Sequence, residues 1–239
     1  IYWEMGQYEK AAENLEKALG HAKEYKLRRN EGVDSNNMGL VHKSAGNLPD
    51  AITWIDAPLA IAREVNNLRD EAIALSNRAL LYRMSGDNKA ARDNYAKALE
   101  MYRKAAFTEG EASALMGLAK MDMVVDKNYG AALEKLNAAA AIYEKLENPG
   151  FLAEAYVQLG QLYQKIATPN RKTRDLVFED EEPDGVSLTP EESLPKSKEF
   201  SGKAKPLAEE TGRKEMIWSS LHGLAFVERE AKNLPAAME

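Results

Sequence analysis

The sequence of 239 residues contains no cysteine, which excludes disulfides, thiolate metal ligands and a thiol nucleophile. Its three histidines lie far apart, and none belongs to the close helical pair that binds a metal ion. No glycine-rich phosphate-binding loop is present, and no apolar run is long enough to cross a membrane. We therefore expect no catalytic activity, no cofactor and no metal site.

Positive charge is also in short supply. The chain has 32 Lys and Arg residues against 38 Asp and Glu residues, which gives a net charge of −6. Because non-specific nucleic-acid binding needs a concentrated positive field, we expect neither a nucleic-acid nor a membrane partner. Hydrophobic residues make up 44% of the chain and charged residues 29%, which is usual for a helix-rich protein in water. We expect a cytoplasmic location.

A repeated pattern dominates what is present. Gly6, Gly46 and Gly86 follow one another at a spacing of 40 residues. After each glycine, apolar residues recur at offsets that match one face of an α-helix. They include Ala11, Ala51 and Ala91, and Leu19, Leu59 and Leu99. Glycine is favoured just after a helix because it adopts positive φ at little cost. Each unit is therefore predicted to be a helix, a tight turn and a second helix.

The pattern continues after one inserted residue. Ala119 lies 40 residues after Ala79, whereas Ala132 lies 41 residues after Ala91. Segment 153–167 is a fifth first helix, and its second helix is expected at about 195–211. A sixth unit begins in segment 215–238. We predict an array of about five repeats plus partial terminal units over residues 1–239, and we expect a piece of a longer protein.

A small residue occupies the eighth position of each first helix, where two helices are expected to cross closely. These residues are Gly39, Ala79, Ala119, Gly160 and Ala225. With the Gly-x-aromatic turn, the alanine that follows and the "KAL" of the second helices, this pattern resembles the tetratricopeptide repeat. The 40-residue form is similar to kinesin light chains and Leu-Gly-Asn-repeat scaffolds. The resemblance implies an all-α fold, a right-handed α-solenoid of stacked antiparallel helix pairs whose first helices line a concave groove.

Prolines depart from this pattern in two second helices, at Pro58 and Pro206. A proline inside a helix removes one hydrogen bond and kinks the helix, at a cost of roughly 3 kcal/mol. We expect a curved helix on the convex side. The alternative is that the kink re-aims the next repeat and widens the groove.

Residues 168–194 form a second departure, a predicted acidic loop inserted between the two helices of the fifth repeat. The stretch up to Pro195 carries eight acidic and three basic side chains, a composition that favours a solvated loop. The apolar "DLVF" at 175–178 either docks on the array or a partner, or anchors the loop. Thr189 and Glu192 match a capping box, and we expect Pro195 to end a single turn before the main helix begins.

Polar residues on the first helices are predicted to face the concave groove and bind a peptide. Amide side chains carry both a donor and an acceptor, so they bind an extended backbone, and Lys43, Arg83 and Lys120 favour an acidic ligand. The predicted site residues are Asn36, Asn37, Lys43, Ser76, Asn77, Arg83, Lys120, Gln158, Gln161 and Gln164. The alternative is a solvated polar helix face.

Asn77, in "LSNRALLYR", also resembles the asparagine of clamps that bind chaperone C-termini. The flanking clamp positions hold Asn36 and Leu40 in the previous repeat and Ser113 and Gly117 in the next, where the clamp has lysine, asparagine and arginine. A carboxylate clamp is therefore not expected. The sequence predicts a protein-protein interaction scaffold. The alternatives are a regulatory or sensor arm of a larger multidomain signalling enzyme, and a self-assembly module that forms a homo-oligomer through exposed terminal repeats.

Overall fold

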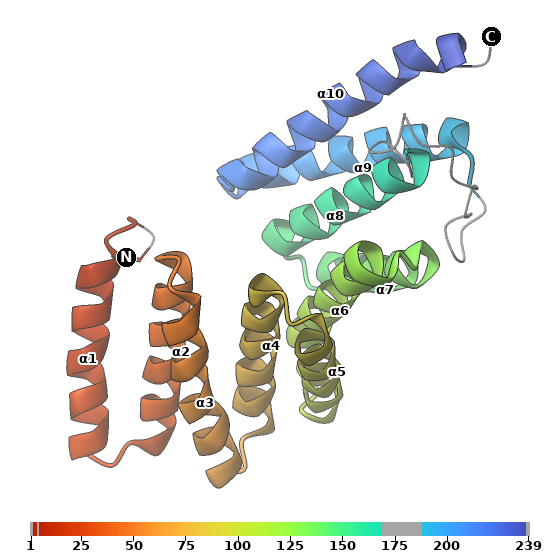
Figure 1. Cartoon of the computed structure of the whole chain (residues 1–239). Coiled ribbons are helices and arrows are strands. Elements are labelled where there is room, and N and C mark those ends of the chain that lie inside the picture. The colour runs from red at the N-terminus through yellow and green to blue at the C-terminus, as the bar shows by residue number, and fades with distance from the viewer. Residues whose placement is uncertain (1, 4, 169–187, 238–239) are drawn as a thin grey trace. The chain divides into compact units, whose positions relative to one another are not determined.

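The computed structural model describes residues 2–3, 5–168 and 188–237, and every regular element in these residues is a helix. The chain divides into two compact units, unit 1 (Ile1–Ala114) and unit 2 (Leu115–Glu239), and the division falls within α6 (Thr108–Met121). The predicted all-α fold of stacked antiparallel helix pairs is confirmed (Figure 1).

Unit 1 contains five complete helices and the first part of α6. Each helix packs against the next, and short turns make successive helices antiparallel, as Figure 1 shows for α1 to α4. The first helices of successive repeats, α2 and α4, also contact one another. The helices are α1 (Tyr8–Glu24), α2 (Arg28–Ser44), α3 (Leu48–Glu64), α4 (Leu68–Ser85) and α5 (Asn88–Lys104).

Unit 2 follows the same plan. The first helices α8 and α10 contact one another, and α9 packs against both. After α6 come the π-helical turn η1 (Asp122–Asp126), α7 (Tyr129–Lys145), α8 (Pro149–Ala167), α9 (Pro190–Glu210) and α10 (Lys214–Ala237).

The turns reveal a shorter period than the glycines do. Left-handed residues follow at intervals of 20, at Gly6, Lys26, Gly46, Asn66, Gly86 and Ala106. Each closes a helix with the same pair of hydrogen bonds, such as Gly46 N–H to the Lys43 carbonyl (3.1 Å) and Asn47 N–H to the His42 carbonyl (2.9 Å). The turn that ends each second helix thus repeats the glycine turn without glycine, which the sequence pattern did not reveal.

The residue after the left-handed position caps the next helix in most of these turns. Its side-chain oxygen accepts a hydrogen bond from the backbone N–H three residues later, which satisfies one of the free donors of the first turn. The capping residues of this kind are Asn47, Asn67, Asp87, Asn128 and Asn148.

The single inserted residue of the fourth unit lies in η1. The wider π turn takes it up, and the left-handed Lys127 that follows stands 41 residues after Gly86. Asp122 in this turn is 4% exposed, and its carboxylate pairs with Lys135 Nζ at 2.7 Å.

Small residues lie at the close helix contacts, as predicted. A side-chain carbon on Gly39 would come within 3.2 Å of the Ala51 carbonyl oxygen, and the Gly160 carbonyl accepts a hydrogen bond from Ser197 Oγ at 3.1 Å. Ala79 and Ala119 are fully buried, with no exposed surface. Ala225 differs because it is exposed, and α10 makes its close contact at Gly223, against the Ser201 side chain.

The prolines interrupt no helix. The capping box predicted at Thr189 and Glu192 is confirmed, but the expected end of that turn at Pro195 is wrong, because α9 continues through Pro195 and Pro206. The loss of one hydrogen bond at Pro195 is outweighed where neighbouring Ser193 and Leu194 are buried. Likewise, α3 continues through the buried Pro58, and α10 continues through the "NLPAA" segment.

Residues 169–187 hold most of the predicted acidic insertion, including "DLVF" at 175–178, and lie outside the described residues. Residues 190–194 of the predicted insertion belong to α9.

Candidate functional site

The candidate site in unit 1 lies on the adjoining first helices α2 and α4. Asn36 of α2 and Asn77 of α4, both predicted site residues, meet here, since Asn77 Nδ2 donates to Asn36 Oδ1 at 2.8 Å. Both side chains are half-buried. This hydrogen bond fixes the two amides against each other and leaves Asn36 Nδ2 and Asn77 Oδ1 without a partner among the described residues.

Asn37 and Lys43 lie on other parts of α2. Asn37 is exposed and lines a depression of about 320 Å³ with Leu40, Tyr2 and Trp3. Lys43 is half-buried, and burial lowers the pKa of its ammonium group. The depression is closed on one side by the Trp3 indole, whose Nε1 donates to Ser44 Oγ at 2.8 Å.

Ser76 and Arg83 of α4 contact tyrosines of α5. Burial raises the pKa of Tyr102 to about 12, and a hydrogen bond from Ser76 opposes this shift. Burial also raises the pKa of Tyr95, opposed by the charge and hydrogen bond of Arg83. These two predicted site residues therefore also hold the phenol groups of the neighbouring helix.

The other predicted site residues belong to unit 2. Lys120 of α6 and Gln161 and Gln164 of α8 are half-buried. Gln158 is only 8% exposed, so it presents little side-chain surface to a ligand.

A cavity of about 190 Å³ in unit 1 was not foreseen from the sequence. It lies between the first halves of α2 and α4 and the second half of α3, and most of its wall is apolar. Val33 and Val65 at its edge are 45% and 40% exposed, so the cavity opens to solvent. Its lining residues are Arg29, Gly32, Val33, Asn36, Pro58, Ile61, Ala62, Val65, Asp70, Ile73 and Ala74.

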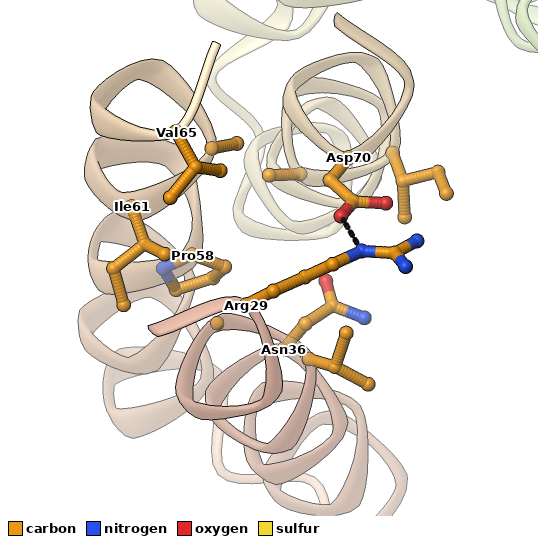
Figure 2. A pocket seen from close by; sticks show the side chains of 11 residues that line it. Arg29, Asn36, Pro58, Ile61, Val65 and Asp70 are labelled. Carbon is orange, nitrogen blue, oxygen red and sulfur yellow. Dashed lines mark hydrogen bonds and ion pairs between the residues drawn. The ribbon is translucent and has the colours of Figure 1, made fainter. Parts of the chain in front are cut away.

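Polar groups border this cavity on one side. Figure 2 shows Arg29 extending from α2 to Asp70 on α4, where Arg29 Nε donates to Asp70 Oδ2 at 2.9 Å. This hydrogen bond raises the pKa of the guanidinium above its ordinary value, so Arg29 stays charged. Both Nη atoms of Arg29 have no partner in the part of the chain that the structure describes. The free groups of Arg29 and Asn36 at this border are all donors.

The described residues contain no group of three or more His, Asp and Glu side chains that could hold a metal ion. None of the helices in residues 5–168 and 188–237 is long and apolar enough to span a membrane.

Comparisons with known proteins agree with this architecture. Family models of the tetratricopeptide repeat match residues 1–24 and 33–104. A comparison with curated proteins finds no match.

Three solved structures share the fold. A Signal Transduction ATPase with Numerous Domains (STAND) protein with a tetratricopeptide repeat sensor, from Pyrococcus horikoshii, aligns with 99% of this chain at 21% identity and a TM-score of 0.67. This chain covers 34% of that protein, about a third of its length. BtubC (BKLC) from P. vanneervenii aligns with 97% of this chain and 92% of its own at 16% identity, with a TM-score of 0.58. The apo form of RapI aligns with 98% of this chain and 81% of its own at 16% identity, with a TM-score of 0.61.

The helix pairs, the small residues at their crossings and the two family matches lead to one conclusion: this chain is a tetratricopeptide-repeat protein.

Proposed function

We propose that the chain is a protein-interaction module whose unit 1 binds an extended segment of a partner protein across α2 and α4. The amide pair of Asn36 and Asn77 carries this proposal. Their mutual hydrogen bond leaves one donor, Asn36 Nδ2, and one acceptor, Asn77 Oδ1, without a partner among the described residues. A peptide backbone offers the complementary carbonyl and N–H groups, so it satisfies both without dependence on its side chains.

Charge favours an acidic partner. Lys43 and Arg83 lie on the same two helices, and Arg29 presents its Nη atoms beside Asn36. Charge-assisted hydrogen bonds to a carboxylate are shorter and roughly twice as strong as neutral ones. A bound carboxylate would also favour the charged form of Lys43, which burial disfavours. Asn37 and Ser76 complete the proposed contacts in unit 1.

The same proposal assigns Lys120 of α6 and Gln158, Gln161 and Gln164 of α8 to partner contacts in unit 2. Gln161 and Gln164 are half-buried, like the asparagine pair of unit 1. We expect them to contribute more than Gln158, whose exposed surface is small.

A peptide library passed over the immobilised chain tests the proposal. We expect acidic, extended peptides to be retained by the wild-type chain and to bind the Asn36→Ala/Asn77→Ala variant roughly tenfold more weakly, since each lost hydrogen bond contributes about 0.5–1.5 kcal/mol. Asn137→Ala is the matched control, because Asn137 is an exposed amide on the second helix α7. Equal retention of every peptide by the wild-type chain and the double variant would contradict the proposal.

A second candidate function is that of a sensor arm in a larger signalling protein. It is favoured by the Pyrococcus structure, which aligns with 99% of this chain and is described as carrying a tetratricopeptide repeat sensor. Sequencing the complete parent gene tests this candidate. A nucleotide-binding or other catalytic domain in the same reading frame is expected, and a gene that encodes helical repeats alone would contradict it. Self-association stays a prediction, which light scattering over a range of concentrations measures.

A further inference from the structure

The cavity of unit 1 has an equivalent place one repeat later, 40 residues along the chain. There the side chain of Tyr102 fills the space among Ala72, Ala98 and Ala114, and Tyr102 is 4% exposed. These three alanines correspond to Gly32, Pro58 and Ala74, which line the cavity. The cavity therefore occupies the place where the next repeat buries a tyrosine of its own chain.

Three substitutions between the two repeats account for the empty space. Ala62 stands where the next repeat has Tyr102, and Asn67 stands where it has Phe107, whose ring centroid lies 5.7 Å from that of Tyr102. Asp70 stands where it has Gly110, and a side-chain carbon at Gly110 would overlap the Tyr102 ring. The first repeat thus lacks the ring, its aromatic neighbour and the glycine that makes room for it.

Unit 2 repeats the filled arrangement. Tyr143, which is 41 residues after Tyr102 and so follows the inserted residue, has no exposed surface. Its ring stacks on Phe151 with centroids 5.3 Å apart. Two successive repeats therefore supply this ring themselves.

The polar groups around the cavity also match a phenol. The Tyr102 hydroxyl is hydrogen-bonded to Ser76, and Asn36 holds the corresponding position beside the cavity. Asn36 Nδ2 has no partner among the described residues, so it is available to donate to a phenol oxygen. Arg69 places its guanidinium 3.8 Å from the Phe107 ring centroid, and its equivalent Arg29 borders the cavity.

We propose that this cavity receives a tyrosine side chain of the partner segment, with the phenol oxygen accepting a hydrogen bond from Asn36 Nδ2. An acidic group next to that tyrosine pairs with the Nη atoms of Arg29. The volume is sufficient, because an apolar cavity of roughly 150 Å³ holds benzene and this one measures about 190 Å³. The inference rests on the proposed function, since it names the side chain by which the partner is recognised.

The first test uses p-cresol, which is the tyrosine side chain as a free molecule, and methyl NMR of the full chain. We expect p-cresol to shift the methyl signals of Val33, Val65 and Ile73 saturably. The variant Ala62→Tyr/Asp70→Gly reproduces the filled repeat and should weaken p-cresol binding by roughly 10- to 100-fold, the equivalent of burying one large apolar side chain. Ala60→Tyr is the matched control, because Ala60 is exposed on the same helix and does not line the cavity.

A chemical comparison isolates the hydrogen bond and does not require the filled variant to fold. Asn36→Ala should weaken p-cresol binding by roughly 2- to 10-fold and leave toluene, which has no hydroxyl, unchanged. Asn36→Ser should restore p-cresol binding, since Ser76 makes this contact in the next repeat. An equal loss of p-cresol and toluene binding would overturn the assigned role of Asn36.

The peptides retained by the wild-type chain complete the test. We expect replacement of their tyrosine by alanine to weaken binding at least roughly tenfold, and Ala62→Tyr/Asp70→Gly to do the same. Peptides that depend on Asn77 but ignore the filled cavity would overturn this inference and leave the proposed function standing. Absence of any retained peptide would contradict the proposed function, and p-cresol titration would still decide whether the cavity takes a phenol. No saturable methyl shift would overturn the inference by itself.

Discussion

Two places in unit 1, separated by one repeat, share an architecture and differ in what fills them. The first lies between α2, α3 and α4 and is a cavity of about 190 Å³, whereas the second holds the buried Tyr102. Each is bordered by the same ion pair, Arg63 with Glu71 at 2.7 Å and Arg103 with Glu111 at 2.8 Å. The repeat backbone therefore tolerates either a ring from its own chain or an open site, and the residue at position 62 or 102 decides which.

This comparison shows how a scaffold acquires specificity without a change of fold. A tyrosine inside the stack contributes to stability through apolar burial and packing. Its replacement by alanine in one repeat gives up that contribution and leaves a shaped, partly apolar surface with free donors at its border. A binding site can thus arise at a repeat position by the removal of a core side chain.

The largest expected effect comes from emptying the filled place. Tyr102→Ala should lower the free energy of unfolding by about 3–5 kcal/mol, because it removes a buried aromatic ring and leaves a cavity. Urea unfolding followed by circular dichroism measures the change. Tyr25→Ala is the control, since Tyr25 is 66% exposed and should change stability little. If both variants unfold at the same urea concentration, Tyr102 is not a packing residue.

A smaller effect is expected at the glycine that makes room for the ring. Gly110→Ala should destabilise the chain by about 1–3 kcal/mol, because the added methyl overlaps the Tyr102 ring. The equivalent change in the first repeat, Asp70→Ala, loses only a surface ion pair and should lower stability by about 0–1 kcal/mol. Thermal unfolding of the two variants side by side tests the contrast, which a larger loss in Asp70→Ala would contradict.

The smallest effect concerns the hydroxyl of Tyr102. Tyr102→Phe should lower stability by about 0.5–1.5 kcal/mol at neutral pH through the lost hydrogen bond with Ser76. Burial raises the pKa of Tyr102 to about 12 from 10.0, so the neutral phenol stabilises the folded state below pH 10.0 and this contribution is lost as the pH rises toward about 12.

Urea unfolding at a series of alkaline pH values measures this contribution. The wild-type chain should lose more stability between pH 10 and 12 than Tyr102→Phe does. Parallel pH profiles for the two proteins would show that the phenol of Tyr102 does not titrate as its burial requires.

The sequence predicts the repeat well because the fold depends on recurrent features. Helical spacing, glycine turns and small residues at Gly39 and Gly160 each report a local requirement that every repeat must meet. The capping box at Thr189 is equally local, and it too was predicted correctly. Pro195 was misjudged because its effect depends on the tertiary packing of α9, which outweighs the loss of one backbone hydrogen bond.

The candidate site was harder to predict because it depends on a difference between repeats. The sequence indicated that Asn36 and Asn77 share a face, but their hydrogen bond requires the distance between α2 and α4. Ala62 could have been aligned with Tyr102 and Tyr143 from the sequence alone. Only the packing shows that this position points into the space between three helices, where a missing ring leaves a cavity.

The central claim is that one place in unit 1 is open to a phenol ring while its equivalent one repeat later is not. A crystal structure of the chain soaked with p-cresol tests this claim most directly. We predict density for one ring between α2, α3 and α4, with its hydroxyl in hydrogen-bonding distance of Asn36, and no ligand beside Tyr102. A cavity without ligand, or p-cresol bound elsewhere on the chain instead, would contradict the account.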